Sequence, residues 1–315
     1  MKTNMRLLPV VLAVSAAAAS SSLGAQDYRA MTRLDTTVRL EHGGTVDLSL
    51  ISGTIRVTGW DRPDVKLTAS LESGTLDFDA NSSRVSLSVD HSENSRGRRH
   101  HDVGEARYEV SVPRGAKLIL EAVSGDVTAS GSRGEIEASS VSGNVRVAEG
   151  VGQVNAEAVS GSVTVSQVNG NLRAESVSGD VRADNVSGNV EASSVSGSLR
   201  LTEVRSRDVR TETVSGDVTY SGSIEPNGKY AFESHSGTIR LNIPKNAGAQ
   251  VSVETFSGDI STAFPAIVRP GQSMRREGHM EFTIGDGRAR ITAQTFSGRI
   301  VINDDMDSTT RRDDE

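Results

Sequence analysis

Apolar and polar residues alternate in short runs through the middle of the chain. In residues 123–129, Val, Gly, Val and Ala take every second position, and Ser, Asp and Thr lie between them. Alternation with a period of two predicts a half-buried strand, with Val123, Gly125 and Val127 facing inward. Residues 141–147 repeat the pattern. A helix is disfavoured, because each internal glycine would cost about 1 kcal/mol relative to alanine.

Glycine recurs every nine residues through this region, and every second glycine closes a Val-Ser-Gly triplet. A short fixed period is typical of a solenoid, in which each coil packs only against its neighbours. Two strands and two corners would complete one coil in about 18 residues, with the triplet on the same side of every coil. The repeat glycines are Gly125, Gly134, Gly143, Gly152, Gly161, Gly170, Gly179, Gly188 and Gly197.

Nine is an odd number, so the alternation must break once in every repeat. Small polar pairs such as Ser139-Ser140, Glu175-Ser176, Asp184-Asn185 and Ser193-Ser194 are the expected corners. Each repeat glycine either lets two backbones approach closely or marks a bend, and the pattern leaves both alternatives open. The triplet serines are expected to form an outward ladder of Ser124, Ser142, Ser160, Ser178 and Ser196.

The regular array covers about 121–203, and the segments on either side of it depart from the period. A one-residue insertion near 205–208 shifts the register. Beyond it the triplet recurs at longer intervals, and Phe256 and Phe296 replace Val, which predicts a wider interior. We therefore expect an all-β fold over residues 36–303. This fold is a single-stranded β-solenoid of the parallel β-helix or β-roll type, with nine-residue strand repeats, about 18 residues per coil and irregular β caps at both ends.

The two ends of the chain are predicted to lie outside the solenoid domain. A charged start, an apolar run over 7–19 and small residues up to Ala25 predict a signal peptide over 1–25. Residues 26–35 are expected to be a flexible lead-in, and the acidic residues 304–315 a disordered tail. The protein is thus expected to be exported to the periplasm or the cell surface, with no transmembrane segment after cleavage.

Composition and charge exclude several function classes. The formal net charge is −7, and removal of the signal peptide takes away two cations and no acids, which gives −9 (−7 − 2). An acidic chain with scattered Lys and Arg argues against nucleic acid as a partner. The absence of cysteine excludes disulfides, thiolate metal sites and a lipidated N-terminal cysteine.

Several motifs resemble those of a known bacterial family. Gly-Thr-Ile-Arg-Val-Thr-Gly-Trp-Asp at 53–61 is similar to its opening motif, and Val-Pro-Arg-Gly-Ala at 112–116 and Ile-Pro-Lys-Asn-Ala at 243–247 resemble its strand-ending turn. Ile-Gly-Asp-Gly at 284–287 resembles its closing segment, and the repeated Val-Ser-Gly-Asp-Val is its most recognisable element. The chain thus resembles the bacterial putative adhesin family, a domain of unknown function with a solenoid-like β fold. The resemblance implies adhesion and brings no catalytic residues.

Calcium-binding β-rolls share the nine-residue period, but they need Asp two residues after glycine, where this array has Val, Ile or Leu. His91, His100, His101 and Asp102 could bind a metal, but histidines without a defined spacing favour a mobile basic loop. Trp60 is expected to cap the N-terminal core rather than offer a sugar platform. We expect no metal and no cofactor.

Two polar rows would follow the solenoid if a coil holds 18 residues. One row reads Thr128, Arg146, Thr164, Arg182 and Arg200, and the opposite row reads Glu137, Asn155, Arg173 and Glu191. Neither row pairs carboxylates, as polysaccharide cleavage needs, and the serines have no recurring His-Asp partner. We expect no catalytic residues and no enzyme. A candidate exposed interaction row is formed by Arg146, Thr164, Arg182 and Arg200.

These features predict an exported, non-catalytic structural or interaction module of the bacterial cell envelope. Many weak contacts to repeated polar ladders would give binding through avidity along the rod. The expected partner is a protein or glycan ligand of the envelope. Two alternatives stand beside this interpretation: a carbohydrate-binding or polysaccharide-acting β-helix protein, and a periplasmic partner of a membrane signalling system.

Overall fold

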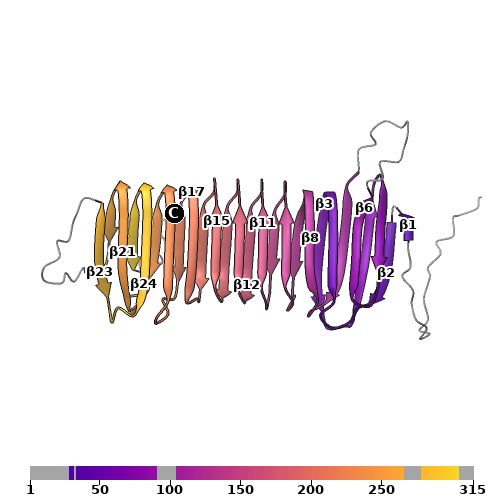
Figure 1. Ribbon diagram of the computed structural model, residues 1–315, viewed down its shortest axis with the longest axis horizontal. Helices are drawn as coiled ribbons and strands as arrows, with labels where there is room; N and C mark the ends of the chain where they lie inside the picture. The colour runs from indigo at the N-terminus through magenta and orange to yellow at the C-terminus, as the bar shows by residue number, and fades with distance from the viewer. Residues whose placement is uncertain (1–27, 32, 91–103, 266–277, 305–315) are drawn as a thin grey trace, which may run out of the picture.

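The computed structural model describes residues 28–31, 33–90, 104–265 and 278–304. The described residues form strands and turns without a helix, and the strands lie across the long axis of an elongated molecule (Figure 1). The predicted signal peptide, residues 305–315 of the predicted tail, and the candidate metal ligands His91, His100, His101 and Asp102 lie outside the described residues.

Twenty-five strands occur in the described residues. They are β1 (Tyr28–Met31), β2 (Arg33–Arg39), β3 (Thr45–Trp60), β4 (Asp64–Leu71), β5 (Thr75–Ala80), β6 (Arg84–Asp90), β7 (Ala106–Pro113), β8 (Lys117–Ser130), β9 (Ile136–Ser140), β10 (Val145–Ala148), β11 (Val154–Ala158), β12 (Val163–Asn169), β13 (Leu172–Ser176), β14 (Val181–Ser187), β15 (Val190–Ser194), β16 (Leu199–Val204), β17 (Asp208–Ser215), β18 (Val218–Gly222), β19 (Lys229–Ser236), β20 (Ile239–Ile243), β21 (Ala249–Ser257), β22 (Ile260–Thr262), β23 (His279–Ile284), β24 (Ala289–Ser297) and β25 (Ile300–Asp304).

The strands build two stacked faces. The first face runs β1, β5, β6, β3, β8, β9, β11, β13, β15, β17, β19, β24, β21, β23. The second face runs β2, β4, β7, β3, β8, β10, β12, β14, β16, β18, β20, β25, β22. The long strands β3 and β8 contribute to both faces, because their two halves pair with different neighbours.

The register of the parallel pairs gives the coil length directly. Val145 lies beside Val163, and Val163 beside Val181, so equivalent residues are 18 apart. Val190 pairs with Val209, 19 residues on, which places one extra residue in the next coil. The predicted solenoid is therefore confirmed, with four to seven residues of each nine-residue repeat in β10 to β16 forming the strand.

Antiparallel strands close both ends of the solenoid. At the N-terminal end β2 pairs with β4, β4 with β7, and β5 with both β1 and β6. Residues 28–31 and 33–35, expected to be a flexible lead-in, therefore lie in strands, because each finds an antiparallel partner. At the other end, β24 and β25 pair with β19 and β20 on one side and with β21 and β22 on the other. The coil formed by β24 and β25, although later in the sequence, therefore lies between these two earlier coils.

A narrow stack of buried Val, Ala and Leu fills the space between the two faces, and each strand hides every second side chain. The core widens after the array, where Tyr220, Tyr230 and Phe232 are buried and Tyr220 contacts both other rings. The prediction that Phe256 and Phe296 widen the interior is wrong, because both side chains are exposed.

The inward position of Val123 was also predicted wrongly. Alternation continues through Ser140 at the end of β9 and breaks at the next two residues, Val141 and Ser142, which are both exposed. The pairs Ser139-Ser140, Glu175-Ser176 and Ser193-Ser194 therefore end strands and are not corners. Asp184-Asn185 does break the alternation, and Asn185 has a φ of +51°.

Candidate functional site

Glycine at the triplet corner allows the backbones of neighbouring coils to come close. A Cβ atom on Gly161 would lie 1.9 Å from the carbonyl oxygen of Gly143, and one on Gly143 would lie 2.1 Å from that of Gly125. No real side chain tolerates such contacts. Of the two alternatives that the sequence left open, close backbone approach therefore holds at these triplet glycines.

Small hydroxyl side chains fill the space beneath this corner. Ser140 Oγ donates to the carbonyl oxygen of Gly125 at 2.8 Å, and Ser176 Oγ donates to that of Gly161 at 2.9 Å. A buried hydroxyl needs such a partner. These serines were missed from the sequence, since a polar residue was expected outside. The signal that could have found them is their fixed offset, three residues before the triplet glycine.

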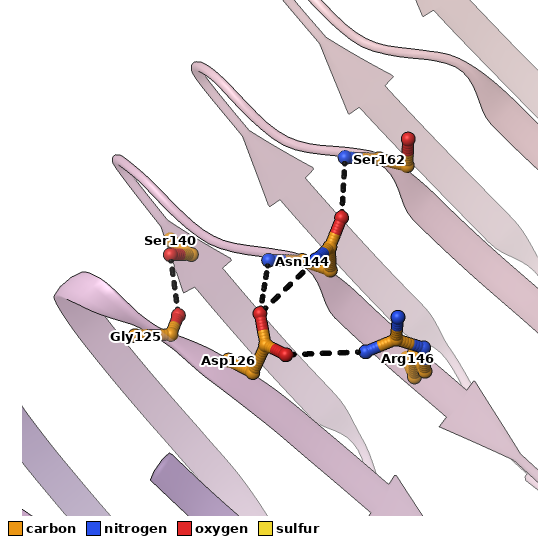
Figure 2. A network of polar contacts seen from close by, with 6 residues as sticks. All are labelled: Gly125, Asp126, Ser140, Asn144, Arg146 and Ser162. Atoms are coloured by element: carbon orange, nitrogen blue, oxygen red, sulfur yellow. Dashed lines mark hydrogen bonds and ion pairs between the residues drawn. The ribbon is translucent and has the colours of Figure 1, made fainter. Parts of the chain in front are cut away.

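Carboxylates and amides after the triplet link one coil to the next (Figure 2). Asp126 Oδ1 accepts from both the backbone N–H and the Nδ2 of Asn144, at 2.8 and 3.1 Å. Asn144 Oδ1 in turn accepts from the Ser162 N–H at 3.1 Å. The same contact recurs from Ser198 N–H to Asp180 and from Thr238 N–H to Asp217. These side chains link the corners of two or three neighbouring coils at a time.

The pKa values of Asp126 and Asp217 are both lowered. Burial of Asp126 opposes its ionisation, but hydrogen bonds from Asn144 and the charge of Arg146 outweigh burial and lower the pKa of the carboxyl. At Asp217 burial is outweighed in the same way by the Thr238 N–H and by Arg240. Both carboxylates are therefore held in the charged form.

The candidate interaction row lies on the second face. Its members occupy adjacent strands β10, β12, β14 and β16 in register: Arg146, Thr164, Arg182 and Arg200. The three arginines are exposed and Thr164 is half-buried. Arg146 lies 3.5 Å from Asp126 and Arg182 lies 2.7 Å from Asp180, so two of the three charges have carboxylate partners. Ligand binding by this row stays a prediction.

The opposite row lies on the first face, where Glu137, Asn155, Arg173 and Glu191 stack in register. Lys117 bonds to Glu137 at 2.8 Å, and Arg173 pairs with Glu191 at 2.9 Å. The acids of this row therefore face cations rather than one another. Among the described residues no three His, Asp or Glu side chains gather as a metal site requires.

An exposed apolar row, which the alternation did not predict, runs along the triplet corner. Backbone bonds from Ser160 to Val141 and from Ser178 to Val159 keep its members in register. Six valines of the row are 44 to 49% exposed: Val123, Val141, Val159, Val177, Val195 and Val214. The next positions hold His235, Phe296 and Phe256, whose rings stack with centroids 4.9 and 4.8 Å apart.

Trp60 is the last residue of β3, whose second half pairs with β7 and β8. It is half-buried, its Nε1 donates to the Asp64 carbonyl oxygen at 2.7 Å, and the Arg62 guanidinium lies 5.1 Å from the ring centroid. The hydrogen bond from Nε1 fixes the edge of the indole ring, and the guanidinium covers one of its faces. Such a ring is suited to cap the N-terminal core, as the sequence predicts.

A protein-family comparison agrees with this architecture. The family model described as Toastrack DUF4097 matches residues 47–303, which is most of the chain. The chain belongs to the Toastrack DUF4097 family. The resemblance drawn from the repeated Val-Ser-Gly-Asp-Val motif is thereby confirmed at the level of a domain of unknown function with a solenoid-like β fold.

Other comparisons add little about this Toastrack protein. A search of curated proteins finds no significant match. A solved structure, described as a putative cell adhesion protein from Clostridium sporogenes, aligns over 86% of this chain and 99% of its own at 13% identity, with a TM-score of 0.24. No helix that could span a bilayer occurs among the described residues.

Proposed function

We propose that this Toastrack protein is an exported, non-catalytic interaction module of the bacterial cell envelope, with an envelope protein or glycan as its partner. The observation that carries the proposal is the register of the coils, which stacks polar and charged side chains into long outward rows. Repeated contacts of modest strength on such rows add through avidity. The predicted signal peptide supports export.

The ion pairs of both polar rows support a binding role over a catalytic one. A general acid–base pair needs two acids with different environments facing one substrate. Here Arg146 and Arg182 lie beside Asp126 and Asp180, and Lys117 lies beside Glu137. Rows that mix positive and negative side chains keep the surface hydrated and offer both hydrogen-bond donors and acceptors. Such rows suit the recognition of a polymer surface.

The location of the protein tests this proposal. Intact cells are treated with a protease and the protein is then detected by immunoblot. We expect loss of the signal if the solenoid is on the outer surface, where adhesion is its role. Digestion only after the outer membrane is opened would place it in the periplasm and point to an envelope partner. A full-length precursor confined to the cytoplasm would contradict the proposal.

A further inference from the structure

The apolar row is a continuous surface rather than scattered exposed residues. Its six valines occupy six successive coils, and Phe296 and Phe256 extend it with exposed fractions of 50 and 79%. Adjacent coils lie about 4.8 Å apart, so the row extends for roughly 40 Å. Single exposed apolar residues are normal on soluble proteins, whereas a contiguous patch marks an interaction site.

A row of acids lies directly beside it on the first face, two residues before six of the nine members of the apolar row. The other three positions hold Ser139, Ser193 and Gln294. This acid row consists of Glu121, Glu157, Glu175, Glu212, Glu233 and Glu254. Glu157 is paired in register with Glu175, and Glu212 with Glu233, so like charges lie on adjacent strands. Such pairs destabilise a sheet unless a cation lies between them.

The acid row keeps most of its charge uncompensated. Glu175 pairs with Arg173 at 2.6 Å, and no other member forms an ion pair within the described part of the chain. On the other side of the corner the pattern is reversed, because Asp180 and Asp217 each bond to an arginine. The uncompensated charge is therefore a property of the side next to the apolar row.

A pocket of about 290 Å³ opens at the N-terminal end of the same surface. Its lining includes Val123 and Val141 of the apolar row, Glu121 of the acid row, and Leu50 and Ile51 from β3. Ile51 lies between residues paired with Ala122 and Ser124, so it continues the apolar row by one coil. The pocket could hold a large apolar side chain at the end of a bound segment.

We propose that the apolar row and the acid row together bind a basic amphipathic α-helix of another protein, lying along the solenoid axis. Positions i, i+3/i+4 and i+7 of a helix are spaced about 5 Å apart along its axis, close to the coil spacing of about 4.8 Å. One apolar side chain would meet each coil, and Lys or Arg on the neighbouring helix face would meet the glutamates. This partner class rests on the proposed interaction function.

A second copy of the chain fits the surface less well. Each copy would bring its own acid row to the contact, and the chain already carries a net charge of −7. Burial of like charges costs more than the apolar contact would return. A neutral or acidic glycan also fits less well, because it would bring no cations to the uncompensated glutamates of the acid row. The charge pattern therefore favours the basic helix.

The test measures binding of a fluorescent peptide to the purified protein by anisotropy. The peptide is a designed helix of about 18 residues, roughly 27 Å long, with a Leu stripe and Lys beside it. A peptide of the same composition with scrambled order is the charge-matched control. We expect the amphipathic peptide to bind at least about tenfold more tightly than the scrambled one.

Matched variants locate the contact. The triple variant V141T/V159T/V177T keeps β-branched side chains on the corner, and S142T/S160T/S178T changes the neighbouring exposed row as its control. The first is expected to weaken binding about tenfold or more and the second less than about twofold. E157Q/E212Q/E233Q is expected to weaken binding and reduce its salt dependence. Circular dichroism checks that each variant is folded.

Several results would overturn the proposal. They are equal binding of the two peptides, no binding of the amphipathic peptide, and unchanged binding by both the valine and the glutamate variants. A dimer that dissociates in V141T/V159T/V177T, seen by sedimentation, would assign the apolar row to a second copy instead. Because purified protein is used, a cytoplasmic location would contradict the proposed function without changing this binding result.

Discussion

At the scale of single residues, the triplet glycines fix how closely the coils approach. A Cβ atom on Gly161 would lie 1.9 Å from the Gly143 carbonyl oxygen, and that oxygen belongs to backbone that cannot move freely. We expect Gly161→Val to lower the free energy of unfolding by at least about 1–3 kcal/mol, as overpacking does. Thermal unfolding followed by circular dichroism measures the effect.

The control for this variant is the preceding residue. Ser160 is exposed on the same corner, so Ser160→Thr is expected to change the free energy of unfolding by less than about 0.5 kcal/mol. Equal effects of the two substitutions would mean that the close contact does not exist.

The lowered pKa values of Asp126 and Asp217 predict a pH dependence of stability. Each carboxyl has a folded pKa below its unfolded value of about 3.9. Its contribution is therefore fully present above about pH 4 and is lost as the pH falls through the folded pKa. D126N/D217N keeps the acceptor oxygens, as Asn144 does naturally, and removes both charges. We expect its thermal midpoint to fall less than that of the wild type on acidification below about pH 4. A parallel fall in both proteins would contradict the assignment.

At the scale of elements, β17 offers two threonines with opposite roles. Thr211 is fully buried and its Oγ1 has no hydrogen-bond partner among the residues that the structure describes. Thr213 Oγ1, in contrast, donates to the Gly197 carbonyl oxygen at 3.0 Å. We expect Thr211→Val to raise the free energy of unfolding by about 1 kcal/mol, because it removes an unsatisfied hydroxyl. Thr213→Val should lower it by about 1 kcal/mol. Thermal midpoints of the two variants give the comparison, and a change of the same sign in both would refute it.

The corner also shows why the strands were predictable and the orientation of the residues just before each triplet glycine was not. Alternation located the strands, since each buries every second residue. It could not show whether Val141 or Ser140 faces inward, because the hydroxyl of Ser140 is satisfied by a glycine carbonyl from the preceding coil. That partner lies 15 residues away and has no local signature. The apolar row was missed for the same reason.

At the scale of the whole molecule, the sequence period predicted the architecture of the solenoid but not the strand pairing at its two ends. The coil length and the insertion near 205–208 followed from spacing alone, because register in a solenoid repeats the sequence period. The position of β24 and β25 between two earlier coils did not follow, since the pairing of β25 with β20 joins residues 61 apart. The antiparallel strands that cover each end depend on such distant pairing as well.

Deletions test the coil as the unit of the whole molecule. Removal of residues 162–179 joins Gly161 to Asp180, restores the sequence Val-Ser-Gly-Asp-Val and takes out one complete coil. Later strands keep their face and register, so we expect a folded β protein with a modestly lower thermal midpoint. Removal of residues 162–170 takes out one strand of the second face only. Every later strand would then have to change faces or leave a gap in the second face, so we expect loss of cooperative unfolding. Circular dichroism and thermal unfolding of the two deletions decide the matter, because a solenoid with a nine-residue coil would tolerate both.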